Sequence, residues 1–302
     1  MKKVEKVLIT GGSGFIGRYV CAECERRRLE YLSLSSTEHR KDANGRCVDL
    51  SDYDEITAAF AYFRPDTVIH LAAIASPVYG DAAEIYRVNV CGTENLLNVA
   101  AEQAPGSRVV LVSTAGVYGN NSVPLLHEGL SPNPVNHYSC SKLITEYLSR
   151  LYADRLRISI VRPFNIIGFG QNENFFIPKL VRHFARRAPE VELGNLSSAR
   201  DYVSVDFCAR LMLELALSEE VPPVTNICTG IPHTCQQVIE LLEDMTGFRP
   251  VVRSTCELRR SNDIWSLVGD PTVMSGIVGG RFSSTPLPEL LGDMLSRYEE
   301  DG

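Results

Sequence analysis

The segment Val7–Gly17 constrains the fold more than any other part of this 302-residue chain. It reads VLITGGSGFIG: a short apolar run stops at a glycine-rich turn, and residues 18–28 continue in a pattern typical of a helix. A short apolar run bounded by turn residues is typical of a buried parallel strand. Glycines at 11, 14 and 17 can adopt positive φ and carry no Cβ, so a phosphate can approach the backbone and the unpaired N–H groups that begin the helix.

A strand, a glycine turn and a helix in this order predict a dinucleotide site, whereas the glycine motif alone would also fit a plain tight turn in another α/β protein. The residues expected to contact the cofactor in this turn are Gly11, Ser13, Gly14, Phe15, Ile16 and Gly17.

Apolar runs and helical patterns alternate through the first half of the chain. This alternation predicts an α/β fold of the Rossmann type, in which a doubly wound parallel sheet carries helices on both faces and the crossovers are right-handed. The predicted strands are Val7–Thr10, Tyr31–Leu34, Thr67–Leu71, Arg108–Ser113 and Ile158–Arg162, and the predicted helices lie near 15–28, 52–63, 84–103 and 138–154.

The pattern loosens after Pro163, where helices near 175–187, 204–218 and 234–246 are separated by stretches rich in glycine and proline. We expect residues 1–165 to form an NAD(P)-binding domain and residues 166–302 to form a smaller, mixed substrate-binding lid. The two parts are expected to interleave, with residues 203–228 packing back on the first.

Charge and composition argue against several classes of protein. A net charge of −7 disfavours a nucleic-acid binder, which would show a basic field. No apolar run approaches the ~20 residues of a membrane helix, and the run before Gly11 is too short for a signal-peptide core. Nine cysteines without disulfide-like spacing indicate a reducing cytoplasm. Cys21 and Cys24 form a C-x-x-C without a second pair, so helix packing is preferred over a redox role, and no metal site is expected.

The end of the second predicted strand bears on the choice between NAD and NADP. An Asp or Glu there would bind the ribose hydroxyls of NAD. This chain instead has small hydroxyl residues over 35–37, followed by cations over 39–41. Ser35 and Arg40, with Arg18 as a possible third member, therefore suit the 2′-phosphate of NADP. The alternative is a solvated loop with ordinary charges.

Two further strand ends are expected to face the cofactor. Asp49 and Leu50 follow a short third strand, and the Asp49 carboxylate would either accept a hydrogen bond from the adenine amino group or cap the next helix. Leu71-Ala72-Ala73 follow the fourth strand, where small residues let the cofactor lie against the strand end. His70 is predicted to be a core histidine rather than a catalyst, and Ser76 in the following loop is expected to face a substrate.

The predicted chemistry centres on Tyr138 and Lys142. Their spacing of four places them on one face of a helix. A free tyrosine has a pKa near ~10. An adjacent ammonium favours the phenolate, so we expect Tyr138 to exchange protons near neutral pH. Thr114, which follows the fifth strand, would hydrogen-bond the same substrate oxygen, with Ser113 as a second candidate. Together these residues predict an acid/base catalyst that interconverts an alcohol and a ketone beside a nicotinamide. The pattern Y-x-x-x-K by itself often occurs by chance on helices.

In combination these motifs resemble those of extended short-chain dehydrogenases/reductases that act on nucleotide sugars. The resemblance implies a cofactor on the N-terminal sheet, contacted also by Tyr138, Lys142 and Pro163, and a nucleoside diphosphate sugar under the C-terminal lid. It also implies a homodimer packed through the helices near 84–103 and 138–154. The matching segments are Thr10–Gly17, His70–Ala73, Thr114 with Val117–Gly119, Tyr138-x-x-x-Lys142 and Arg162–Asn165, within a resemblance that runs from about residue 5 to about residue 273.

Two downstream segments, 194–206 and 260–272, look like those of GDP-4-keto-6-deoxymannose reductases. By that resemblance Asn165, Arg200 and Arg260 hold the diphosphate or the nucleotide. An anionic substrate on an acidic protein needs arginines, whose fork matches phosphate oxygens, although each arginine would otherwise form a surface ion pair. Lys179 is a further candidate for the lining of the substrate pocket.

Three departures from the family pattern matter. Related dehydratases carry an acidic pair after the catalytic threonine, whereas this chain has Ala115-Gly116, which disfavours dehydration. Residues 278–282 stand where the family shows Gly-Trp-x-Pro, so no structure is predicted for the last thirty residues. His137 replaces a proline or serine, and would either line the sugar pocket or simply begin the helix.

Three functions are compatible with these residues. In a reductase, NADPH would deliver hydride to C4 of a nucleotide-linked 4-keto-6-deoxyhexose; Tyr138 would protonate the oxygen, Lys142 would lower the tyrosine pKa and hold the nicotinamide ribose, and Thr114 would orient the carbonyl. A 4-epimerase would use the same residues with a retained NAD. Ser35 and Arg40 favour the reductase. A non-catalytic binding protein or redox sensor would be expected to lack the tyrosine or the lysine, and both are present.

Overall fold

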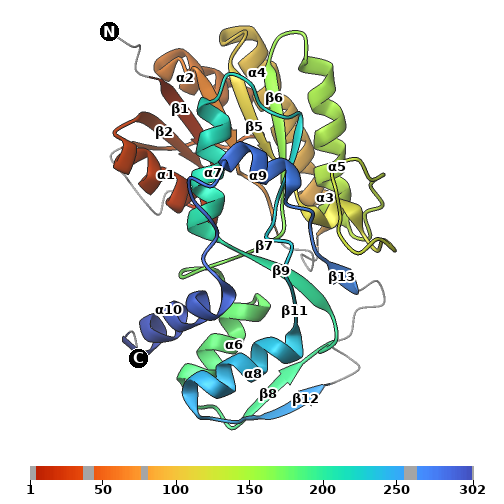
Figure 1. Cartoon of the computed structure of the whole chain (residues 1–302). Coiled ribbons are helices and arrows are strands. Elements are labelled where there is room, and N and C mark those ends of the chain that lie inside the picture. Colours follow the sequence, from red (N-terminus) through yellow and green to blue (C-terminus); the bar gives the residue numbers. More distant parts are fainter. Residues whose placement is uncertain (1–4, 37–43, 76–80, 255–263, 301–302) are drawn as a thin grey trace. The chain divides into compact units, whose positions relative to one another are not determined.

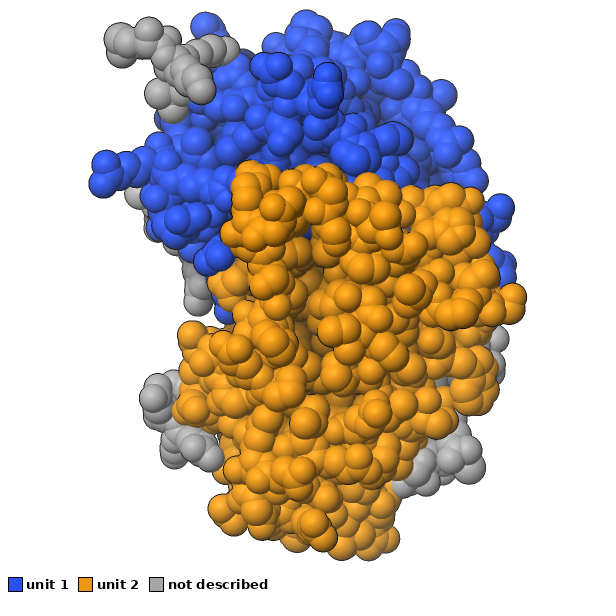
Figure 2. Space-filling model, in the orientation of Figure 1, with its two compact units in different colours: residues 1–118, 131–163, 209–225 blue, residues 119–130, 164–208, 226–302 orange. Residues whose placement is uncertain are grey.

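The computed structural model describes residues 5–36, 44–75, 81–254 and 264–300. The chain divides into two compact units that alternate along the sequence (Figure 2). Residues 1–118, 131–163 and 209–225 form the first unit, and residues 119–130, 164–208 and 226–302 form the second. The cofactor and substrate roles expected for the two parts of the chain stay predictions.

A largely parallel sheet organises the first unit. Among the described residues its strands follow the order β10-β6-β5-β4-β1-β2-β3, and the strands from β6 to β3 pair in parallel. This is the order of a doubly wound nucleotide-binding fold, extended by β10, so the predicted fold class is confirmed. Figure 1 labels β2, β1, β5 and β6 of this sheet. The strands are β1 (Lys6–Thr10), β2 (Glu30–Ser35), β3 (Gly45–Cys47), β4 (Thr67–His70), β5 (Arg108–Val112), β6 (Arg157–Pro163) and β10 (Val224–Ile227).

The helices of this unit lie where the sequence periodicity predicts them, with shifts of one to a few residues at their ends. They are α1 (Phe15–Arg27), α2 (Tyr53–Phe63), α3 (Ala82–Tyr86), α4 (Gly92–Gln103), α5 (His137–Ser149) and α7 (Val205–Leu217), together with the π-helical η1 (Arg87–Cys91) and the 3₁₀ segments η2 (Ala115–Tyr118) and η3 (Arg150–Tyr152).

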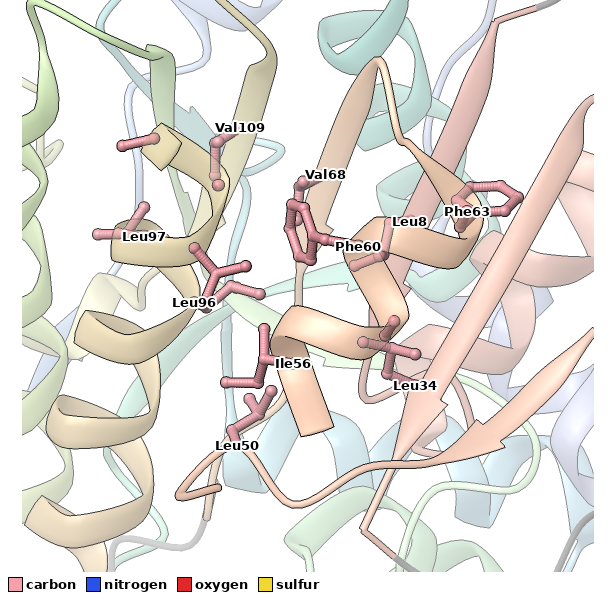
Figure 3. Packing of buried hydrophobic residues seen from close by; sticks show 14 of the residues in the cluster. Leu8, Leu34, Leu50, Ile56, Phe60, Phe63, Val68, Leu96, Leu97 and Val109 are labelled. Carbon is pink, nitrogen blue, oxygen red and sulfur yellow. The ribbon is translucent and has the colours of Figure 1, made fainter. Parts of the chain in front are cut away.

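Helices α2 and α4 pack on one face of the sheet. Leu8, Val68 and Val109 are aligned across β1, β4 and β5, and each is at most 1% exposed. Figure 3 shows this row with Phe60 of α2 and Leu96 of α4 in the same cluster. Each large apolar side chain buried in this way contributes about 1.5–3 kcal/mol to stability.

Helix α7 covers the opposite face. Successive strand residues point to opposite sides, so Thr67 faces away from the side to which Val68 contributes. The Thr67 hydroxyl donates to the carbonyl oxygen of Ala216 on α7 over 3.2 Å. An ion pair of 2.7 Å between Arg27 and Glu214 ties α1 to α7, so both lie on this side.

The helix predicted over 84–103 is interrupted. It consists of α3, a π-helical turn over Arg87–Cys91 and α4. The fully buried Asn89 lies in this turn, accepts a hydrogen bond from the Ile74 backbone N–H (2.8 Å) and donates to the hydroxyl of Ser141 on α5 (3.0 Å). Single π-helical turns inside α-helices are rare and frequently lie at functional sites.

The second unit is built from short strands and three larger helices. Strand β9 (Ala199–Ser204) is flanked by β11 (Pro232–Thr234), β13 (Ser266–Leu267) and β7 (Asn165–Ile167), and β8 (Glu190–Leu193) pairs with β12 (Val251–Ser254). The core of this unit joins α6 (Phe176–Ala185), α8 (Cys235–Thr246) and α10 (Leu287–Glu300). Helix α8 begins with a complete capping box between Thr234 and Gln237.

The last thirty residues, for which the sequence supported no assignment, contain α10 and most of α9 (Thr272–Val278). The apolar positions Leu287, Leu291 and Met294 of α10 are nearly fully buried in the core of the second unit. Across the described part of the chain, no helix combines the length and the apolar character that a membrane span requires.

Candidate active site

The glycine turn after β1 is packed against the ends of two neighbouring strands. The Gly11 N–H donates to the Leu34 carbonyl of β2 over 2.7 Å. Gly11 has φ +72°, and a Cβ built on it would lie 2.7 Å from the backbone nitrogen of Ala72, just after β4. β1 and β4 are neighbours at the point where the strand order reverses, which is where open α/β sheets bind ligands.

This turn fits a pyrophosphate. Gly14, which has no side chain, stands at the N-cap of α1, and the first turn of α1 carries no acidic side chain. A Cβ on Gly17 would lie 2.2 Å from the Gly11 carbonyl oxygen, so only glycine allows this close packing. The N–H groups in the first turn of α1 and the positive end of that helix favour an anion. The predicted contacts Ser13, Phe15 and Ile16 lie in this same segment.

Ser35 lies beside the glycine turn. Its hydroxyl oxygen accepts a hydrogen bond from the Ser13 backbone N–H over 3.2 Å, so two residues predicted to bind cofactor meet at the end of β2. Arg40, predicted to accompany Ser35, lies outside the described residues. Arg18 is half-buried on α1.

Asp49 and Leu50 lie between β3 and α2. The Asp49 carboxylate accepts from the Ser51 N–H at 2.8 Å, and this bond lowers the pKa of Asp49. Asp52 is the N-cap of α2, accepting from the N–H groups of the first turn. Of the two roles that the sequence left open for Asp49, capping of the helix therefore belongs to Asp52. Leu50 is buried against Gly92 of α4.

The loop after β4 is fixed by a buried histidine. His70 lies fully buried between the hydroxyl of Thr10 (2.6 Å) and that of Thr93 (2.8 Å), and burial lowers its pKa to about 3. The Ala72 N–H donates to the Thr10 hydroxyl, which places Leu71-Ala72-Ala73 against the glycine turn. The prediction of a core histidine is confirmed. Ser76 lies outside the described residues.

Thr114, Tyr138 and Lys142 form the core of the candidate site. Thr114 follows β5, and α5 begins at His137 with Asn136 as its N-cap. Tyr138 is half-buried and hydrogen-bonded to Thr114. Lys142, one turn further along α5, is only 2% exposed. The structure thus joins the threonine and the tyrosine and places the lysine on the same helix.

The pKa of Tyr138 differs in direction from the expectation based on a neighbouring ammonium. Burial raises the pKa of Tyr138 to about 12, although the hydrogen bond with Thr114 acts to lower it. Burial also lowers the pKa of Lys142 to about 8. Desolvation disfavours the charged form of each group and is the largest cause of both shifts. The phenol is therefore protonated at neutral pH.

The segment after Thr114 is closely packed. Ala115 is fully buried, and a Cβ on Gly116 would lie 2.4 Å from the hydroxyl oxygen of Ser139 on α5. His137 is exposed, and its ring lies 3.1 Å from the hydroxyl of Tyr86.

In the second unit, three predicted substrate residues are described. Asn165 begins β7, and its side-chain oxygen is buried without a hydrogen-bond partner. Arg200 lies half-buried on β9, the strand that pairs with β7. The exposed Lys179 on α6 donates to the Glu192 carbonyl of β8 over 3.1 Å. Arg260 lies outside the described residues.

One residue next to these positions was not predicted from the sequence to have a role. Asp201, adjacent to Arg200, is fully buried and accepts hydrogen bonds from the backbone N–H groups of Thr229, Gly230 and Gly269. It thereby ties two loops to β9. The only sign of this role in the sequence is a single acidic residue within an apolar strand.

Pro163, predicted to contact the cofactor, is buried at the end of β6.

Comparison with known proteins agrees with this geometry. Residues 7–228 match the NAD dependent epimerase/dehydratase family. The chain is 35% identical, over 96% of each protein, to GDP-6-deoxy-D-talose 4-dehydrogenase of Aggregatibacter actinomycetemcomitans. It is 30% identical to GDP-6-deoxy-D-mannose reductase of Pseudomonas aeruginosa, covering 85% of this chain and 86% of the relative. The structure of RMD from Pseudomonas aeruginosa complexed with NADPH superposes with a TM-score of 0.86 at 27% identity, covering 99% of this chain and all of the other.

The family match spans the glycine turn, the Thr114–Tyr138–Lys142 group and the sheet that carries both, and the similarity to these relatives extends over most of the chain. The chain therefore belongs to the NAD-dependent epimerase/dehydratase family of extended short-chain dehydrogenases/reductases.

Proposed function

We propose that this protein is an NADPH-dependent reductase that converts the 4-keto group of a nucleoside-diphosphate-linked 6-deoxyhexose into an alcohol. The observation that carries the proposal is the hydrogen-bonded pair Thr114–Tyr138, with the buried Lys142 one helical turn further on, in the unit that also holds the glycine turn. Two relatives support the substrate class, since their names describe a 4-dehydrogenase and a reductase of GDP-linked 6-deoxyhexoses.

Each residue of the group has a distinct role in this proposal. A bound nicotinamide supplies the hydride. Tyr138 donates its phenolic proton to the ketone oxygen, and Thr114 donates a hydrogen bond that orients the same oxygen. Lys142 places a positive charge beside the phenolate that remains after transfer, and so stabilises it.

The protonation state of Tyr138 suits the reduction step. A pKa of about 12 leaves the phenol protonated at neutral pH, which is the form that a ketone reduction consumes. The absence of acids at Ala115-Gly116 disfavours a dehydratase.

We assign the preference for NADPH to Ser35 and Arg40. Ser35 is held at the end of β2, beside the glycine turn, by its bond with Ser13. A serine there carries no negative charge that would repel a 2′-phosphate, in contrast to the acid typical of NAD sites. The NADPH complex of RMD supports this choice. NAD is the alternative.

We assign the nucleoside diphosphate to Asn165, Arg200 and Arg260, which belong to the second unit, and propose Lys179 and Ser76 as further substrate contacts. The unpartnered buried oxygen of Asn165 supports a ligand role, because a buried amide oxygen rarely stays without a donor. Arg200 offers the fork geometry that matches phosphate oxygens.

The protein is further proposed to be a homodimer that uses α4 and α5. Ile144 and Tyr147, which share a face of α5, are 39% and 50% exposed, and Leu151 in the adjoining η3 is 66% exposed. Large apolar side chains exposed together in this way are typical of an interface.

The proposal is tested with Tyr138→Phe. This variant is expected to lose turnover of a 4-keto-6-deoxy nucleotide sugar by more than about 100-fold, while its affinity for NADPH, measured by fluorescence titration, stays within about 3-fold of wild type. A variant that no longer binds NADPH would show that Tyr138 acts in folding or cofactor binding instead. Retained turnover would refute the role of Tyr138 as the acid.

A further inference from the structure

A buried cluster of polar side chains lies along α5, one turn beyond Lys142. Glu146 is 4% exposed, and its carboxylate accepts two hydrogen bonds from Arg162 of β6, at 3.0 Å and 2.6 Å. The Ser113 hydroxyl donates to the same carboxylate over 2.5 Å. Arg162 also donates to the Tyr118 hydroxyl over 2.9 Å, and its guanidinium lies 4.9 Å from the centre of that ring.

The cluster joins the elements that carry the proposed catalytic residues. Ser113 directly precedes Thr114, and Tyr118 ends the 3₁₀ segment that follows it. Glu146 is on α5, four residues after Lys142 and eight after Tyr138, so all three share a helical face. The carboxylate of Glu146 is thus the point at which α5 is fixed to the end of β5.

The negative charge of Glu146 distinguishes it from a residue that only fills space in the protein interior. A lysine that is 2% exposed is almost never found without a compensating charge. The groups that interact electrostatically with Lys142 are Glu146 from α5 and the uncharged His70 from β4, while Arg162 and Ser113 contact the Glu146 carboxylate. Among these, Glu146 supplies the negative charge.

A buried ion pair is weak evidence for a stabilising role, because desolvation offsets most of its attraction. The Glu146–Arg162 pair therefore needs another explanation than stability alone. We propose that Glu146 is a positioning residue for the reaction proposed above: its carboxylate keeps Lys142 charged inside the protein and, through Ser113, holds Thr114 in line with Tyr138. This inference rests on the proposed function for its catalytic meaning, but its electrostatic part can be measured without a substrate.

The test is a lysine NMR titration with matched variants. The chain has only six lysines, so the Cε signals of protein labelled with [13Cε]lysine are few, and Lys142→Arg identifies the signal of Lys142. Burial lowers the pKa of Lys142 to about 8 in the wild type, against the pull of Glu146. In Glu146→Gln the carboxylate is lost, and Lys142 is expected to titrate at a pH lower by about 1 or more.

Two controls separate charge from packing. Ser113→Ala removes a hydrogen bond but no charge, and Glu146→Asp keeps the charge, so Lys142 should titrate near its wild-type pH in both. Glu146→Gln leaves Arg162 buried without its partner and can fail to fold; Glu146→Gln combined with Arg162→Gln removes both charges, and Lys142 is expected to titrate between its wild-type pH and that of Glu146→Gln, because the loss of the Arg162 cation offsets part of the loss of the carboxylate.

Turnover is measured on the same proteins. If Glu146 acts as proposed, the pH at which kcat falls on the alkaline side shifts down together with the Lys142 titration in the Gln variants and stays in place in Ser113→Ala. A Lys142 titration that is the same in the wild type and in the Gln variants would overturn the inference. A shifted titration in a protein that reduces no 4-keto sugar would overturn the proposed function and leave the electrostatic link intact.

Discussion

Gly17 lies so close to Gly11 that a Cβ built on Gly17 would be 2.2 Å from the Gly11 carbonyl oxygen and 2.6 Å from the Cα of Gly12. Both atoms belong to the backbone and cannot move aside as a side chain would. Gly17→Ala is therefore expected to displace the turn, weaken NADPH binding by more than about 10-fold and cost about 1–3 kcal/mol of stability. Fluorescence titration and denaturant unfolding measure the two effects.

Gly292→Ala is the matched control for that substitution. A Cβ at Gly292 of α10 meets nothing within 4 Å, and alanine is the better helix former, so this variant is expected to bind NADPH as the wild type does and to be no less stable. Wild-type affinity in Gly17→Ala would show that the turn does not hold the cofactor.

The contact between Gly116 and Ser139 gives a second prediction. A Cβ at Gly116 would lie 2.4 Å from the Ser139 hydroxyl oxygen but 3.6 Å from its Cβ. Gly116→Ala is expected to destabilise the protein by about 1–3 kcal/mol, and the added change Ser139→Ala to restore most of that loss. A double-mutant cycle by urea unfolding measures the coupling; additive effects would contradict the close packing of η2 on α5.

His70 makes stability depend on pH. Its pKa is lowered to about 3 in the folded protein, whereas an unfolded histidine titrates near ~6.5. The unfolded chain therefore binds more protons below pH ~6.5, and the contribution of His70 to stability, complete above that pH, is lost as the pH falls. Between pH 7.5 and pH 5 this loss is about 2 kcal/mol.

The measurement is the free energy of unfolding in urea at several pH values, for the wild type and for His70→Gln. Glutamine offers one donor and one acceptor to Thr10 and Thr93 but does not titrate. The variant is expected to be less stable than the wild type at pH 7.5 and to lose about 2 kcal/mol less on acidification. An identical pH dependence in both proteins would show that His70 is not the group responsible.

The exposed apolar face of α5 predicts the oligomeric state. Tyr147→Glu places a charge between Ile144 and Leu151 and is expected to convert the proposed dimer into a monomer in sedimentation experiments. Tyr62→Glu on α2 is the control, because Tyr62 is 64% exposed and lies outside the proposed interface. A wild-type protein that sediments as a monomer would refute the interface.

The local motifs predicted the first unit well. Val7–Gly17 carries its turn, strand and helix within one stretch, so sequence alone located β1, α1 and the close packing of the turn. Tyr138 and Lys142 were equally visible, since a spacing of four determines their shared face whatever surrounds the helix. Their pKa values were not, because burial depends on residues distant in sequence.

The contacts that sequence missed are long-range. Glu146 and Arg162 are ordinary charged residues until α5 packs on β6, and the clamp formed by Asp201 joins loops that lie 28 and 68 residues further along the chain. The π-helical turn at Asn89 follows from a partner at Ile74, which helical periodicity does not reveal. The final helix α10 lacked a usable motif, although its buried leucines follow helical spacing.

The most direct test of the proposed function follows one hydrogen atom. The protein is incubated with a GDP- or dTDP-linked 4-keto-6-deoxyhexose and NADPH that carries deuterium at the transferable C4 position, and the product is analysed by NMR and mass spectrometry. The account predicts one deuterium at C4 of the sugar and one NADP⁺ formed for each product. Inversion of C4 in a nucleotide hexose, with no cofactor consumed and no deuterium incorporated, would identify an epimerase and contradict it.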